Sequence, residues 1–287
     1  MKKIYLSLML CSLLNGAKLE FGHGKVDLTG GILGLQGTIS DNINTYSFII
    51  EHDNLFSSNL FYSLDLTLLD SNKLKQITTP YMNNLLSNTN NLLSKRSLSQ
   101  LRIPEMEHTI QGADLGLGIG YDLINADDRN YLGIGLYVGA SLPYISSSKS
   151  SKEKIDLNSI NANYFLDSDT DILTYKLGVG LYAQKSLGDV LDIYTKAIYA
   201  YQNANVSNSY ANLDIDVNGK YLEYGAGLNI RFAKLSKNFY VTIGAKHKEW
   251  DIGKVGVNIS GTNLFKTPKS NMKIKSEVIT LGVGYSF

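Results

Sequence analysis

Several stretches of this 287-residue chain alternate strictly between an apolar residue and a glycine or polar residue. The clearest is ADLGLGIGYDL, 113–123, where the apolar residues share one parity and aspartate and glycine share the other. Period-two alternation is typical of a β-strand, whose successive side chains point to opposite faces. The pattern recurs at 131–145, 172–187, 220–232, 238–250 and 273–287, and less regularly at 19–37, 45–52, 59–69 and 190–202. The sequence therefore predicts an all-β chain of about ten strands, with 8–12 compatible with the pattern.

The residues between the apolar ones indicate which kind of β-structure forms. In a soluble sandwich the polar face meets water, whereas here that face consists mainly of glycines with isolated charges. Small residues and paired charges suit the crowded inside of a narrow barrel whose apolar face meets lipid. Most of the predicted strands have about ten residues or more, enough to cross a bilayer at a tilt. The pattern predicts a transmembrane antiparallel up-and-down β-barrel.

The first 17 residues have the layout of a secretory signal peptide. Lys2 and Lys3 precede an apolar run, and the small residues Gly16 and Ala17 follow it;. We expect cleavage after Ala17, which leaves residues 18–287 as a single barrel. The only cysteine, Cys11, lies in the signal segment, so we expect no thiol and no disulfide in the mature chain;.

The connections between the predicted strands alternate in length after the first pair. Short connections are predicted at 53–58, 125–130, 188–189 and 233–237. Long connections, rich in Ser, Asn and Lys, are predicted at 70–109, 146–170, 203–219 and 251–271. We expect the long connections to leave the barrel at one end, as extracellular loops.

The last predicted strand ends on two aromatic residues of its apolar parity, Tyr285 and Phe287. Together with the signal peptide and the alternating strands, this terminus resembles the outer-membrane β-barrel proteins of Gram-negative bacteria. In that family a final aromatic residue is part of the signal read by the barrel-assembly machinery. The resemblance implies export to the bacterial outer membrane, both termini in the periplasm, and a monomer surrounded by outer-membrane lipid and lipopolysaccharide. It also implies that Tyr285 and Phe287 form the assembly signal.

Charged residues on the polar parity of the strands are candidates for lining the lumen. They are Asp65, Asp114, Asp122, Lys176, Asp192, Lys196, Glu223, Arg231, Lys246 and Lys248. Such charges could line a selective passage or form a network of salt bridges. We favour the network, because a barrel of this size is mostly filled by its own side chains.

The strand count and the chain length are similar to those of the omptin surface proteases. That resemblance implies a pair of aspartates facing a His–Asp dyad at the outer rim. His108, with Glu105 and Glu107, and His247, with Glu249, are the histidines that we place toward that end;. Neither histidine has an aspartate two residues away, so we assign no catalytic residue. Because the histidines are far apart in sequence and no cysteine remains, we expect no metal site and no cofactor.

The strand count also sets the expected function. About ten strands are too few for a wide general porin, so we expect a structural or surface-interaction role. A narrow channel for small solutes and an omptin-like surface hydrolase are the alternatives. A formal net charge of +1 gives no reason to expect a nucleic-acid partner;.

Overall fold

The computed structural model describes residues 16–30, 38–54, 59–76, 106–124, 129–149, 168–208, 213–232, 238–255 and 270–286. Within them, eleven strands form one antiparallel sheet. They are β1 (Gly16–Thr29), β2 (Thr38–Asn54), β3 (Leu60–Ser71), β4 (Leu74–Gln76), β5 (Met106–Asp122), β6 (Tyr131–Lys149), β7 (Ser168–Leu187), β8 (Leu191–Asn208), β9 (Leu213–Arg231), β10 (Phe239–Val255) and β11 (Ser270–Ser286). No helix in the described residues is long and apolar enough to cross a membrane.

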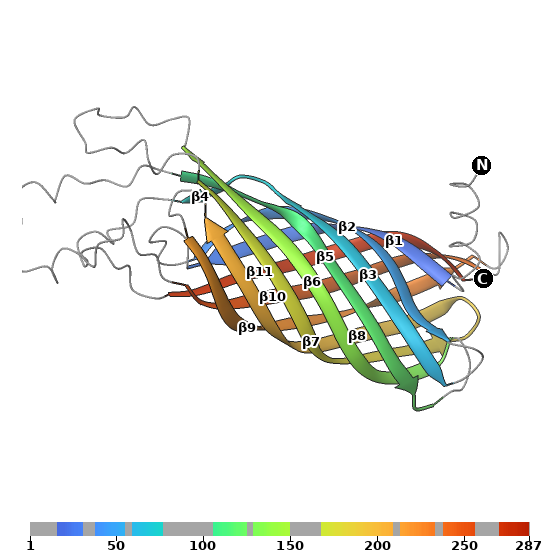
Figure 1. Cartoon of the computed structure of the whole chain (residues 1–287). Helices are drawn as coiled ribbons and strands as arrows, with labels where there is room; N and C mark the ends of the chain where they lie inside the picture. The colour runs from blue at the N-terminus through green and yellow to red at the C-terminus, as the bar shows by residue number, and fades with distance from the viewer. Residues whose placement is uncertain are drawn as a thin grey trace, which may run out of the picture.

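The sheet closes on itself as a barrel. Its strand order is β3-β2-β1-β11-β10-β9-β8-β7-β6-β5-β4, with a further pairing of β3 to β5 that completes the ring. The seam between the first and last strands runs from the Gly16–Ser286 pair to the Thr29–Lys273 pair. The short β4 continues the pairing along β5 beyond the end of β3. Figure 1 shows the ten long strands running obliquely around one barrel. The predicted ten-stranded up-and-down barrel is therefore confirmed.

Inward glycines allow tyrosine rings to fill the lumen. A Cβ atom added to Gly116 would lie 2.7 Å from the ring of Tyr137, and one added to Gly180 would lie 2.7 Å from the ring of Tyr182. Both tyrosines are buried. The alternating glycines of the sequence thus leave space on the inner wall that large rings from the same or neighbouring strands occupy.

The polarity of the inner and outer faces of the barrel wall reverses partway along the strands. Strand β1 shows the change clearly. At the end near the short turns, Leu19 and Phe21 are exposed on the outer face, while Glu20 is buried inside. Further along the same strand Lys25 faces outward, and Leu28 is fully buried inside. The first part therefore has an apolar outer band suited to lipid, and the second has the polar exterior and apolar core of a soluble barrel.

This reversal corrects the predicted strand ends. β8 continues to Asn208 and β9 starts at Leu213, so most of the expected 203–219 loop is strand. β6 likewise runs into 146–170, β10 and β11 run into 251–271, and β5 and the short β4 take up parts of 70–109. The first strand differs in the other direction, because it ends at Thr29 rather than at residue 37. Residues 78–94, where Pro80 at a first-turn position and Met82, Leu85 and Leu86 at helical spacing indicate a short helix within a loop, lie outside the described residues;.

Candidate functional site in the barrel interior

Three acids and three lysines form an ion-pair network inside the membrane-facing part of the barrel. Lys196 Nζ lies 3.0 Å from Asp65 Oδ2 and 2.8 Å from Glu223 Oε1. Lys248 Nζ lies 2.9 Å from Asp114 Oδ2 and 3.8 Å from Asp65 Oδ1. The sixth member, Lys176, pairs with Asp114. We call these six residues the central network. Their charges balance, and they come from six strands, so the network joins opposite walls of the barrel.

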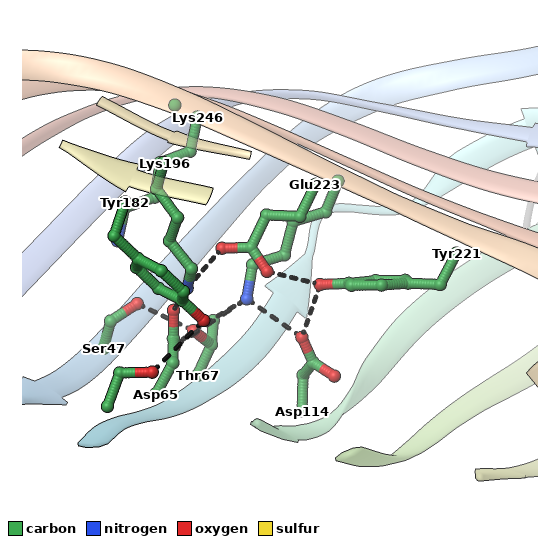
Figure 2. Close-up of polar contacts among 12 residues, drawn as sticks. Ser47, Asp65, Thr67, Asp114, Tyr182, Lys196, Tyr221, Glu223 and Lys246 are labelled. Carbon is green, nitrogen blue, oxygen red and sulfur yellow. Dashed lines mark hydrogen bonds and ion pairs between the residues drawn. The ribbon is translucent and has the colours of Figure 1, made fainter. Parts of the chain in front are cut away.

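Neutral side chains complete the hydrogen bonding of the central network. The Tyr221 hydroxyl lies 2.7 Å from Glu223 Oε2 and 3.2 Å from Asp114 Oδ2, and Figure 2 shows it between the two carboxylates. Ser141 donates to Asp114 Oδ1 at 2.6 Å, and the indole of Trp250 donates to the same serine oxygen at 3.0 Å. Buried charges are tolerated when pairing and hydrogen bonds replace water, and both replacements are present here.

Two smaller ion-pair groups lie nearer the short-turn end. Glu20 of β1 lies 3.1 Å from Lys18 Nζ and 2.5 Å from Lys246 Nζ. Asp192 of β8 forms ion pairs with two arginines, through Oδ1 to Arg129 Nη2 at 2.6 Å and through Oδ2 to Arg231 Nε at 2.8 Å. These contacts add ties across the β1–β10 and β8–β9 parts of the wall.

Asp122 has a different role from the other predicted inward charges. Its Oδ1 accepts hydrogen bonds from the backbone N–H groups of Ile124, at 3.0 Å, and Leu132, at 3.2 Å. Both donors flank the β5–β6 connection. Asp122 therefore stabilises the start of a turn instead of joining the central network.

An apolar layer fills the lumen on the side of the long connections. Its side chains are almost fully buried and pack as one cluster with Tyr137, Tyr221 and Trp250. The members that lie beyond the central network include Val26, Leu28, Ile43, Leu69, Leu74, Ile110, Ile145, Ile172, Val206, Ile252, Val255, Met272 and Ile274. The described interior thus contains two successive layers of side chains. Ion pairs lie within the lipid-facing part of the barrel, and apolar side chains lie beyond it.

Charged residues cover the outer wall around this apolar layer. Lys273 Nζ lies 3.0 Å from Glu249 and 3.1 Å from Asp251, and Lys275 Nζ lies 3.2 Å from Glu249. Partial burial alone would raise the pKa of Glu249, but the hydrogen bonds from both lysines hold that pKa below its ordinary value. The hydrogen bonds to Glu249 and Asp251 raise the pKa of Lys273. A surface of paired charges is typical of a wall in contact with water.

The histidines considered for catalysis lie on different faces of the wall. His108 points into the apolar layer at the outer end, where burial lowers its pKa to about 4. His247 lies on the outer face, stacked on Tyr224 with a centroid separation of 4.6 Å and placed 3.3 Å from Glu277. The two histidines therefore share no site, and the expected acid/base grouping of His247 with Glu249 is only a 3.9 Å contact.

All of the predicted lumen-facing charges are on the inner face, and the structure adds partners that the sequence reasoning missed. Lys18 and Glu20 were overlooked although they share the inward parity in KLEFG, and this parity could have revealed them. Arg129 precedes a strand and carries no such signal. Tyr285 is exposed on the outer face of β11, as its predicted parity requires, whereas Phe287 lies outside the described residues.

The architecture is that of a closed, ten-stranded, transmembrane-type barrel with a filled interior. No protein-family model matches the sequence, and no curated protein matches it. Among solved structures, it is similar to the outer membrane protease OmpT from Escherichia coli, with a TM-score of 0.50, 12% identity, and coverage of 95% of this chain and 97% of that one. The chain therefore has the fold of an outer-membrane β-barrel protein.

Two other solved structures have lower TM-scores than the OmpT structure. The transport unit of the autotransporter AIDA-I from Escherichia coli has a TM-score of 0.44 at 10% identity, covering 95% of this chain and 90% of that one. Ail, the attachment invasion locus protein of Yersinia pestis, has a TM-score of 0.31 at 11% identity, covering 95% of this chain and 98% of that one. A β-barrel fold by itself does not select a function.

Proposed function

We propose that this protein is a monomeric, closed barrel of the bacterial outer membrane that has a structural role or presents an interaction surface outside the membrane. The observation that carries the proposal is that the central network and the apolar layer occupy successive parts of the described lumen. A solute moving along the axis would have to displace the central network and then the apolar layer. Opening the network would separate buried charges, which costs several kcal/mol for each ion left without its partner.

The surface-interaction part of the proposal is supported by the outer half of the wall. Strands continue past the lipid-facing band, and their outer faces there carry polar and charged side chains, including Lys25, Asn205, Asp216 and Glu277. A barrel that served only to cross the bilayer would have no need of this extension. The extension places the strand ends, from which the long connections start, beyond the lipid-facing band, and connecting segments commonly carry binding residues;.

Planar-bilayer recording tests the closed state. The refolded protein, verified by its heat-dependent mobility on gels, should give no discrete openings at moderate voltages. A detergent sample without protein is the control. Stable unitary currents that depend on the protein would support the narrow-channel alternative and refute the closed barrel. The omptin-like alternative has less support, because His108 and His247 lie on opposite faces of the wall.

Deletion of a predicted loop tests the interaction role. Removing residues 80–103, which lie outside the described residues, should abolish binding to whole-cell or matrix targets while the barrel still folds. A deletion of similar kind within 256–269 is the matched control. Unchanged binding after the first deletion would show that residues 80–103 are not the interaction surface. Absence of binding by the intact protein would leave a purely structural role.

The export signal is also part of the proposal. Gly16 and Ala17 pair with Ser286 and Tyr285 at the start of β1, so cleavage after Ala17 would remove two paired positions from the seam. The mass of the mature protein decides the matter, because cleavage before Gly16 and cleavage after Ala17 differ by two residues. A full-length mass in the outer-membrane fraction would contradict a cleaved signal.

A further inference from the structure

The lipid-facing band is hollowed at the seam of the barrel. A groove of about 680 Å³ crosses five neighbouring strands, β3, β2, β1, β11 and β10. Its walls are the outward side chains Leu19, Phe21, Tyr46, Phe48, Leu66, Leu68, Val241, Leu281 and Val283. Its floor is the backbone of the barrel wall, because Glu20 and Ser47 there point their side chains inward and Gly282 has none. The volume is within the range of about 300–1,000 Å³ that is typical of small-molecule sites.

We propose that this groove holds an acyl chain of an outer-membrane lipid as an ordered ligand. The inference rests on the membrane location and is independent of whether the lumen conducts. A hollow at hydrocarbon depth cannot be filled by water without leaving that water short of hydrogen-bond partners, since the walls are apolar. A flexible hydrocarbon chain that lies in this apolar groove makes more dispersion contacts than one that lies on a flat part of the wall.

The polar residues beside the groove mark where the lipid headgroup would lie. Next to Phe21 and Tyr46, whose rings are 5.4 Å apart, the outward positions become polar. His23 pairs in register with Asn44, and its Nδ1 lies 2.8 Å from the amide oxygen Oδ1. Lys25 follows on the same strand. The groove therefore ends at a hydrogen-bonding rim, as an amphiphile with a polar head and an apolar tail requires.

A second copy of the chain fits this surface less well. In a two-fold interface the same patch must provide both the hollow and the projection that fills it. The large side chains of this patch, Phe21, Tyr46 and Phe48, already form the walls of the hollow. The other walls are short aliphatic side chains, which cannot reach into a groove on a partner.

Fluorescence quenching by brominated lipid chains tests the proposal. The chain has a single tryptophan, Trp250, which is fully buried in the lumen and gives a constant background. Phe21→Trp places a reporter in the groove wall, and Tyr175→Trp places a control on the lipid-facing surface of β7, on the far side of the barrel. Both are refolded into vesicles of phosphatidylcholine with increasing fractions of dibrominated phosphatidylcholine.

A lipid tail that moves from the bilayer into the groove gains dispersion contacts but no hydrophobic free energy, because both surroundings are apolar. An ordered chain should therefore give the groove reporter only about threefold higher relative affinity for brominated lipid than the control. Adding Leu68→Ala to the reporter removes part of one wall and should return the ratio toward one. Equal quenching of the two reporters would overturn the proposal. Weaker quenching in the groove would also overturn it and would indicate coverage by a second copy. Tyr46→Trp repeats the test from the other wall if Phe21→Trp does not fold.

Discussion

Asp114→Asn should be among the most destabilising conservative changes in the barrel. The carboxylate pairs with Lys176 and Lys248, accepts a hydrogen bond from Ser141, and lies 3.2 Å from the Tyr221 hydroxyl. Asparagine keeps the shape but removes the charge, so two lysines would share the remaining two carboxylates of the central network with Lys196. Removing one partner from a buried ion pair costs about 3–5 kcal/mol. We expect a loss of that size in the free energy of unfolding.

Urea unfolding of the protein refolded into lipid vesicles measures this loss, and Trp250 is a local reporter. Its indole donates to Ser141, which in turn donates to Asp114, so the emission should respond to disruption of the network as well as to unfolding. Asp70→Asn is the matched control, because Asp70 is exposed on the outer face of β3, where its Oδ1 accepts a hydrogen bond from Gln111. We expect that change to stay within about 0.5 kcal/mol.

A second variant separates charge imbalance from loss of hydrogen bonds. Adding Lys176→Met to Asp114→Asn restores equal numbers of acids and lysines and should recover about 2 kcal/mol, since an apolar side chain replaces an unpaired ammonium. If Asp114→Asn costs less than about 1 kcal/mol, or the double variant is no more stable than the single one, then the central network does not hold the walls together.

Three further outcomes follow from other parts of the structure. Burial holds the pKa of His108 at about 4 against 6.5 for the unfolded chain, so the unfolded state takes up the proton first and stability falls by about 2 kcal/mol between pH 7 and pH 5;. His108→Gln should remove that part of the pH dependence in urea titrations, and the exposed His23→Gln should retain it. Gly178→Val should abolish the heat-modifiable folded band on gels, because a side chain there would overlap the backbone oxygen of Tyr199. Gly225→Ala should fold, because its Cβ would lie 3.1 Å from the nearest atom, the backbone oxygen of Ala245. Deletion of Phe287 should slow membrane assembly in cells while leaving the urea midpoint of the assembled barrel unchanged, and normal assembly would contradict its role as a signal.

The membrane-crossing part of each strand could be predicted from the sequence because one parity stays apolar there. Leu115, Leu117 and Ile119 alternate with glycines that no solvent-exposed face would need. The outer part was missed because the apolar parity changes sides within a strand. On β8 the outward residues change from Tyr201 to Asn203 while the inward ones become Ala204 and Val206. A change of parity looks like the end of a strand when only the sequence is read.

The pairing of the buried charges could not be predicted. The inward parity of Asp65, Lys196 and Glu223 follows from alternation, but Lys196 and Asp65 are 131 residues apart, and their contact depends on the size and stagger of the closed ring;. A barrel with a different stagger would bring other inward residues together. The same limit applies to the lipid-facing groove, which needs the registers of five strands.

The reversal of wall polarity determines how far the strand ends lie beyond the lipid-facing band. From Tyr201, the last aromatic side chain facing lipid on β8, the strand continues seven residues to Asn208. At about 3.3 Å per residue and a tilt of about 40°, that distance places the end of β8 roughly 18 Å above the ring of Tyr201. The headgroup layer is about 5–8 Å thick. Under the proposed interaction role, a partner bound at this end would approach from the surrounding medium or from another cell, not from within the same bilayer.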